Sequence, residues 1–210
     1  MPDAGGQERS DPGIGCGGQE RSDPGIGCGG QERSDSGRIG PAGEVAALVA
    51  VQSTLATPPV VTVARAMSHF GEHAQGWVAL SALGALIQPK RRRDWLLVGV
   101  GALSAHAAAI LVKLVVRRKR PHDPAIEVNV DTPSALSFPS AHATSTTAAA
   151  MLLSRATRSP IPLVLVPAMA LSRLVLGVHY PTDVLAGMAL GATVARTAAR
   201  LAGRNEGDAK

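Results

Sequence analysis

One uncharged stretch of this chain, residues 95–112, constrains the possible folds more than any other feature. Its length approaches the ~20 apolar residues that a helix needs to cross the hydrocarbon core of a bilayer. Apolar residues make up 45% of the chain but aromatic residues only 2%, with Ala, Val and Leu abundant. This composition favours helices over packed sheets, so we expect an all-α fold with residues 95–116 as a membrane-spanning helix.

Further helices are expected on both sides of this span. Pro58-Pro59 must separate the first two helices, because proline cannot continue a helix. We expect these two helices to form an interfacial or re-entrant hairpin. The sequence therefore predicts a membrane-embedded helical bundle, with a soluble bundle as the alternative. The other expected helices cover residues 44–57, 60–70, 74–88, 140–154, 161–178 and 182–202.

The first 43 residues have a different composition. The sequence GGQERSDPGIGC fills residues 5–16, recurs unchanged in residues 17–28, and degrades in a third copy. Such a repeat, rich in Gly, Ser and Asp with one Ile per copy, cannot bury enough apolar surface to offset its ordering entropy. We therefore expect a disordered repeat tail at 1–43, a helical domain at 44–202 and a polar C-terminal tail at 203–210.

The charge balance predicts an anionic partner. The formal net charge is +5 and the sequence pI is about 9.9, which by themselves do not separate nucleic acid, anionic lipid and a phosphorylated metabolite. Residues 90–93 are four consecutive cations between two apolar helices, as is typical of a cytoplasmic turn. The aromatic residues fall near expected helix ends, where an interfacial belt would place them: Phe70, Trp77, Trp95, Phe138 and Tyr180.

Three short motifs supply the groups that phosphate chemistry requires. When the expected helices are followed through a bilayer, all three motifs reach the same face, although 70 residues separate the first from the last. Together they contribute three cations, two imidazoles and a carboxylate. The motifs are Lys113 with Arg120-Pro121, then Pro139-Ser140-Ala141-His142, and finally Ser172-Arg173 with His179 and Asp183.

Taken singly, each motif also has a structural interpretation. The cations at 117–120 could be a helix end that faces solvent or lipid headgroups, and Ser140 could be a helix cap. His106, inside the span, is interpreted as a packed interior residue. His122 could contact a substrate or belong only to a loop. The joint occurrence of the three motifs on one face favours a functional site.

The patterns K-x6-R-P, P-S-x-H and S-R-x5-H-x3-D resemble the signature of the phosphatidic acid phosphatase type 2 and haloperoxidase superfamily. The resemblance covers residues 44–202 and departs only at Ala141, where the family usually has glycine. Within the family, the segments VVRRKRPH and TPSALSFPSAHATS are most similar to short bacterial phosphatases of polyprenyl-linked 5-phosphoribose.

The resemblance implies a mechanism without a metal or other cofactor. His179 would attack phosphorus to give a phosphohistidine, and Asp183 would hold its other ring nitrogen. His142 would protonate the leaving oxygen and then deprotonate the attacking water. The residues implied in phosphate binding are Lys113, Arg120, Ser140, Ala141 and Arg173.

The implied substrate is a lipid-linked phosphate. Hydrolysis of polyprenylphosphoryl 5-phosphoribose would give polyprenylphosphoryl ribose for cell-wall arabinan synthesis, in a multi-pass protein of the cell membrane with no nucleic-acid partner. A phosphatase for phosphatidate or polyprenyl diphosphate would use the same residues, as would a haloperoxidase or a phosphotransferase. A non-catalytic protein that binds anionic lipid is the alternative outside enzymes. Oligomeric state and membrane orientation stay open.

Overall fold

The computed structural model describes residues 41–207, which form helices and loops and no β-strand. Residues 1–40 of the tail expected at 1–43, and residues 208–210, lie outside the described part. The first helix begins at Pro41 and the last continues to Gly207, so both extend beyond the domain limits expected from the sequence. The helices are α1 (Pro41–Leu55), α2 (Pro58–Gly71), α3 (Gln75–Ile87), α4 (Arg92–Val116), α5 (Ala141–Thr157), α6 (Leu165–Val175) and α7 (Pro181–Gly207).

Pro58-Pro59 divides α1 from α2, as expected. Thr57 is extended, and the two prolines occupy the first turn of α2, where the fixed φ and missing N–H of proline are tolerated. The chain bends by 116° between the α1 segment and the segment that runs from Pro58 to Ile87. A broken span or a re-entrant loop would have such a bend, and the interfacial or re-entrant hairpin stays a prediction.

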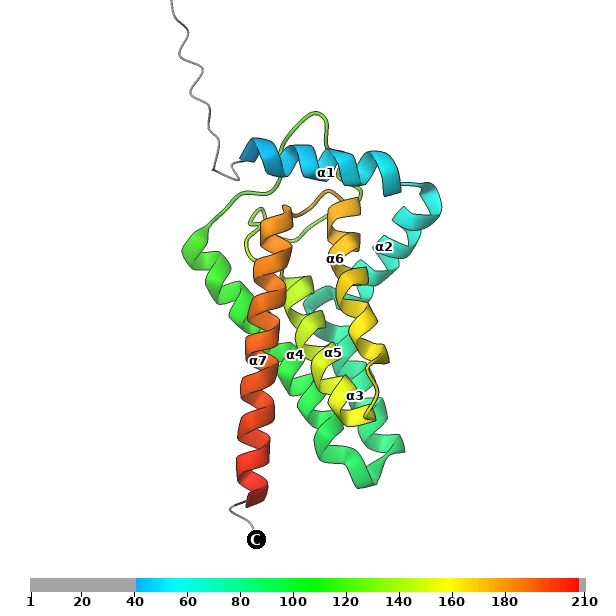
Figure 1. The fold of residues 1–210 in the computed structure, drawn as a ribbon, viewed down its shortest axis with the longest axis vertical. Helices are drawn as coiled ribbons and strands as arrows, with labels where there is room; N and C mark the ends of the chain where they lie inside the picture. Colours follow the sequence, from blue (N-terminus) through cyan, green and yellow to red (C-terminus); the bar gives the residue numbers. More distant parts are fainter. Residues whose placement is uncertain (1–40, 208–210) are drawn as a thin grey trace, which may run out of the picture. The chain divides into compact units, whose positions relative to one another are not determined.

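The central helices α3, α4, α5 and α7 lie side by side (Figure 1), and small residues at their contacts allow them to pack closely. Ala102 and Ala105 of α4 and Ala148 of α5 are completely buried in one core cluster. A Cβ on Gly84 of α3 would lie 2.1 Å from the Trp95 ring, so the indole needs a glycine opposite it. This packing also corrects the expected aromatic belt.

The belt prediction is wrong for both tryptophans. Trp77 is 2% exposed and Trp95 is 7% exposed, and both belong to the core cluster between helices. Their positions near helix ends in the sequence do not bring them to the surface, because neighbouring helices cover these ends. The two indoles therefore stabilise the bundle from inside.

Large apolar side chains cover much of the bundle's outer surface. Val115, Leu86 and Ile161 are 82%, 76% and 76% exposed. Exposed apolar surface of this extent marks contact with a partner or a membrane. Within residues 41–207, the helix Pro89–Val116 is long and apolar enough to cross a bilayer by itself. This confirms the long apolar helix expected at residues 95–116, and its passage through a membrane stays a prediction.

The long loop between α4 and α5 and the short turn between α6 and α7 meet at one end of the bundle. The Ser137 N–H donates to the Arg118 carbonyl at 2.7 Å, and the Asn129 N–H donates to the Leu176 carbonyl at 3.1 Å. Gly177 allows the turn because its φ is +69°. In Figure 1, α1 lies across the same end, over α6 and α7. The parts that carry the three motifs therefore converge.

Candidate active site

A cavity of about 780 Å³ opens at this end of the bundle, and all three motifs contribute to its wall. The expected convergence of the motifs on one face is therefore confirmed. Asp183 and Ser140 are fully buried behind the wall. The motif residues that line the cavity are Lys113, Arg120, Ala141, His142, Arg173 and His179.

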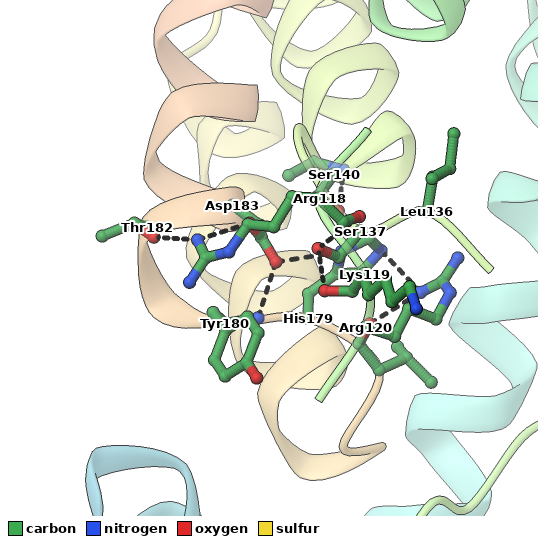
Figure 2. Close-up of polar contacts among 12 residues, drawn as sticks. Arg118, Lys119, Arg120, Leu136, Ser137, Ser140, His179, Tyr180, Thr182 and Asp183 are labelled. Atoms are coloured by element: carbon green, nitrogen blue, oxygen red, sulfur yellow. Dashed lines mark hydrogen bonds and ion pairs between the residues drawn. The ribbon is translucent and has the colours of Figure 1, made fainter. Parts of the chain in front are cut away.

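Arg120 is held by the backbone on both sides of the cavity mouth. Its Nε donates to the Ser134 carbonyl at 2.8 Å, and Nη1 donates to the Val178 carbonyl at 2.6 Å. The same Nη1 lies 3.3 Å from Nε2 of His179 (Figure 2). Burial lowers the pKa of Arg120 to about 10, so the guanidinium is still charged at neutral pH. A cation is thus fixed beside the imidazole.

Two further cations approach from α4 and α6. Lys113 Nζ donates to the carbonyls of Leu136 and Ser137 at 3.0 and 3.2 Å. Arg173 is 2% exposed, and its Nη1 donates to the Ser68 hydroxyl at 3.1 Å. Since neutral partners hold all these contacts, the charges of Lys113 and Arg173 are left to an incoming anion.

The two ring nitrogens of His179 face different surroundings. Nδ1 lies 3.8 Å from Asp183 Oδ2, which is longer than a hydrogen bond, while Nε2 lies toward Arg120 and the cavity. Burial and then the cations Arg120 and Lys113 lower the pKa of His179 well below its ordinary value. The imidazole is therefore neutral and has a nitrogen lone pair available at neutral pH.

Asp183 is itself held in a fixed position. Its Oδ2 accepts from the Tyr180 N–H at 2.8 Å, and its Oδ1 accepts from Arg118 Nη1 at 2.9 Å (Figure 2). The Asp183 carbonyl accepts from the Ser140 N–H at 2.9 Å, which joins the first turn of α7 to the start of α5. The carboxylate is thus positioned before any substrate arrives.

His142 lies in the first turn of α5, with one ring nitrogen occupied. Nε2 lies 3.0 Å from the Ser68 carbonyl. Because a carbonyl only accepts, we assign the proton to Nε2, which leaves Nδ1 free for exchange. A Cβ on Gly71 would lie 2.7 Å from Cδ2 of His142, so the α2 backbone packs directly on this ring.

Ser140 caps α5. Its hydroxyl accepts from the Ala143 N–H at 3.4 Å, so the capping interpretation that the sequence left open is confirmed. Ala141, where related signatures have glycine, lines the cavity at the first residue of the helix. A helix N-terminus favours anions, and the phosphate-binding roles expected for Ser140 and Ala141 stay predictions.

Sequence reasoning missed Arg118 and Glu44. Arg118 was grouped with a helix end that faces solvent or headgroups, but it contacts Asp183 and Thr182, and its guanidinium lies 4.2 Å from the centre of the Tyr180 ring. It also pairs with Glu44 of α1, which is 4% exposed. The one indication in the sequence is Glu44 itself, a single carboxylate in an otherwise uncharged apolar helix.

Comparison with protein families and curated proteins gives consistent matches. The family model described as PAP2 superfamily matches residues 93–206. A Mycobacterium tuberculosis protein named decaprenylphosphoryl-5-phosphoribose phosphatase is 65% identical over 155 residues, which is 73% of this chain and 88% of that protein. A Mycolicibacterium smegmatis protein of the same name is 69% identical over 148 residues, covering 70% of this chain and 82% of that protein.

Two solved structures have the same fold at low sequence identity. The transmembrane PAP2 type phosphatidylglycerolphosphate phosphatase from Bacillus subtilis matches with a TM-score of 0.60 and 20% identity, over 76% of this chain and 86% of that chain. Aquifex aeolicus LpxE matches with a TM-score of 0.55 and 18% identity, over 74% and 94% of the two chains. These likenesses concern the fold.

Proposed function

Because this chain belongs to the PAP2 superfamily, we propose that it removes the terminal phosphate from polyprenylphosphoryl 5-phosphoribose. One observation carries the proposal: three cations and two imidazoles surround one cavity in a chain 65–69% identical to proteins named for this activity. The product would be polyprenylphosphoryl ribose.

In the first step, Nε2 of His179 attacks phosphorus and the bond from phosphorus to the ribose oxygen breaks. Nε2 is suited to this role because it faces the cavity while Nδ1 faces the Asp183 carboxylate. The positive charge that develops on the ring is stabilised by Asp183. Lys113, Arg120 and Arg173 neutralise the charge on the other phosphate oxygens.

His142 acts on the leaving group. The bound phosphate anion favours a second proton on this ring, so that both Nδ1 and Nε2 are protonated. His142 then donates the Nδ1 proton to the ribose oxygen, while the Ser68 carbonyl keeps the Nε2 proton in place. In the second step, Nδ1 takes a proton from a water molecule that attacks the phosphohistidine. This step releases inorganic phosphate, frees His179 and returns His142 to its doubly protonated form.

The surroundings of the cavity suit a lipid-linked substrate. The cavity opens beside α4, whose outer face carries exposed side chains such as Leu111 and Leu114. A polyprenyl chain can thus remain in hydrocarbon while the phosphorylated head enters the polar cavity. We place the protein in the cell membrane as a multi-pass protein, with α1 and α2 at the end that holds the site.

A substrate panel tests this proposal. Phosphate release is measured for the detergent-purified protein in EDTA with polyprenylphosphoryl 5-phosphoribose, phosphatidate and undecaprenyl diphosphate. We expect the highest kcat/KM for the phosphoribosyl lipid, with no effect of the chelator. Equal turnover of all three lipids would refute the substrate assignment, and inhibition by EDTA would refute the metal-independent chemistry.

A further inference from the structure

The cavity has space for more than a phosphate group. Its volume of about 780 Å³ lies within the range of pockets that enclose whole small-molecule ligands. Besides the motif residues, its wall includes His73, from the turn between α2 and α3, and His106 of α4. Neither histidine has a part in the phosphate chemistry described above.

These two histidines lie on the leaving-group side of the site. The ring of His142, which protonates the leaving oxygen, packs against Gly71. Gly71 directly precedes the 3-10 turn η1 (Glu72–Ala74), which carries His73. The group bonded to the leaving oxygen must extend away from phosphorus past His142, and this turn is the neighbouring part of the wall.

His106 faces the same part of the cavity with only part of its ring. Its Nδ1 is buried and has no hydrogen-bond partner among residues 41–207, so a ligand in the cavity would pair with the other ring nitrogen, Nε2. The His106 ring centre lies 5.9 Å from that of His73, so both imidazoles can reach one small ligand. Seven residues separate His106 from Lys113, which is about two helical turns on the same side of α4. Lys113 and His106 therefore line the same wall of the cavity.

The turn that carries His73 is conformationally strained. His73 and Ala74 have φ values of +49° and +59°, in the left-handed region that residues other than glycine rarely adopt. Strain of this kind persists where the surrounding structure enforces it and is concentrated at functional sites. Here it holds an imidazole at the cavity wall beside His106.

We propose that His73 and His106 form a sugar subsite that binds the hydroxyl groups of the ribose on the leaving-group side. This inference rests on the proposed function. A neutral imidazole offers one donor and one acceptor, as a sugar hydroxyl does, so the two groups can pair without a charge.

Two substrates that differ only in the ring hydroxyls test the subsite. These are farnesylphosphoryl 5-phosphoribose and its 2,3-dideoxyribose analogue, and the ratio of their kcat/KM values measures the hydroxyl preference. We expect the unmodified protein to prefer the ribosyl substrate by about tenfold or more. His106→Phe and His73→Gly should bring the ratio close to one, while kcat/KM for the dideoxy analogue stays within about twofold.

Matched variants separate recognition from folding. His106→Gln retains hydrogen-bonding groups and should keep part of the preference. His73→Gly should raise Tm because glycine tolerates positive φ, even as it loses the preference. Ala74→Gly changes the same turn but keeps the imidazole, so its preference should equal that of the unmodified protein.

The outcomes distinguish this inference from the proposed function. If the unmodified protein hydrolyses phosphatidate but not the phosphoribosyl lipid, the proposed function fails and the subsite fails with it. If the ribosyl lipid is the better substrate and the His106→Phe and His73→Gly variants keep the hydroxyl preference, only the subsite is refuted. An equal loss on both substrates would also refute it, because the histidines would then have a structural role.

Discussion

Replacing Glu44 tests whether α1 is fastened to the active-site end through a buried ion pair. The Glu44 carboxylate, 4% exposed, pairs with Arg118 and accepts from the Thr182 hydroxyl and N–H, the latter at 3.2 Å. In Glu44→Ala these donors lose their acceptor. Arg118 keeps its contact with Asp183, so the alanine variant separates α1 from the rest of the network without dismantling it.

The expected loss follows from burial. Removing one partner of a buried ion pair costs about 3–5 kcal/mol, and the 26% exposure of the Arg118 side chain allows partial rehydration. We therefore expect the free energy of unfolding to fall by about 3 kcal/mol. For a domain of this size, that corresponds to a decrease in Tm of roughly 6–12 °C.

Thermal unfolding in detergent, followed by intrinsic fluorescence, measures the effect. Glu44→Gln keeps an oxygen acceptor for Thr182 and should lose about half as much stability. Glu127→Ala removes an exposed carboxylate and should change the free energy by less than about 0.5 kcal/mol. If Glu44→Ala and Glu127→Ala shift Tm equally, the ion pair does not fasten α1 and our reasoning is wrong.

Three further predictions concern the catalytic groups. Gly71→Ala should lower kcat by about tenfold or more in a phosphate-release assay, because the added Cβ would lie 2.7 Å from His142 Cδ2 and displace that ring. Gly43→Ala is the control: a Cβ there meets no atom within 4 Å, so kcat should not change. The lowered pKa of His179 predicts that its NMR signals titrate with a midpoint well below 6.5. Because the unfolded chain then binds the proton more readily, stability falls as the pH drops below about 6.5, and a midpoint near 6.5 would contradict this. Arg120→Lys should lower kcat/KM by about 100-fold, because an ammonium cannot reproduce the contacts of the planar guanidinium with two carbonyls and the His179 imidazole. A loss below about threefold would disprove the role of Arg120 in binding the phosphate.

The sequence predicted the helices and the convergence of the motifs because both depend on local signals. Pro58-Pro59 ends one helix and begins another by covalent geometry alone, and the uncharged stretch at residues 95–112 favours a long apolar helix. Once the helix order was fixed, the motifs had to reach one end of the bundle. Spacing along the chain was sufficient for this inference.

Contacts between distant segments could not be predicted in the same way. Arg118 pairs with Glu44 across 74 residues, and no local pattern distinguishes it from the neighbouring solvent-facing cations. His106 was interpreted as a packed interior residue, but it lines the cavity, whereas His122 lies outside the cavity lining. Each outcome depends on which helix packs opposite, and that depends on the whole core.

The central claim is that His179 carries the phosphoryl group. Rapid acid-free quenching of the protein with polyprenylphosphoryl 5-phosphoribose, followed by mass spectrometry of peptides, measures this directly. We predict one phosphoryl group per chain on His179, absent from His179→Gln, which should also release no phosphate. Phosphate release by His179→Gln at the rate of the unmodified protein, or a phosphoryl group on another residue, would contradict the proposed mechanism.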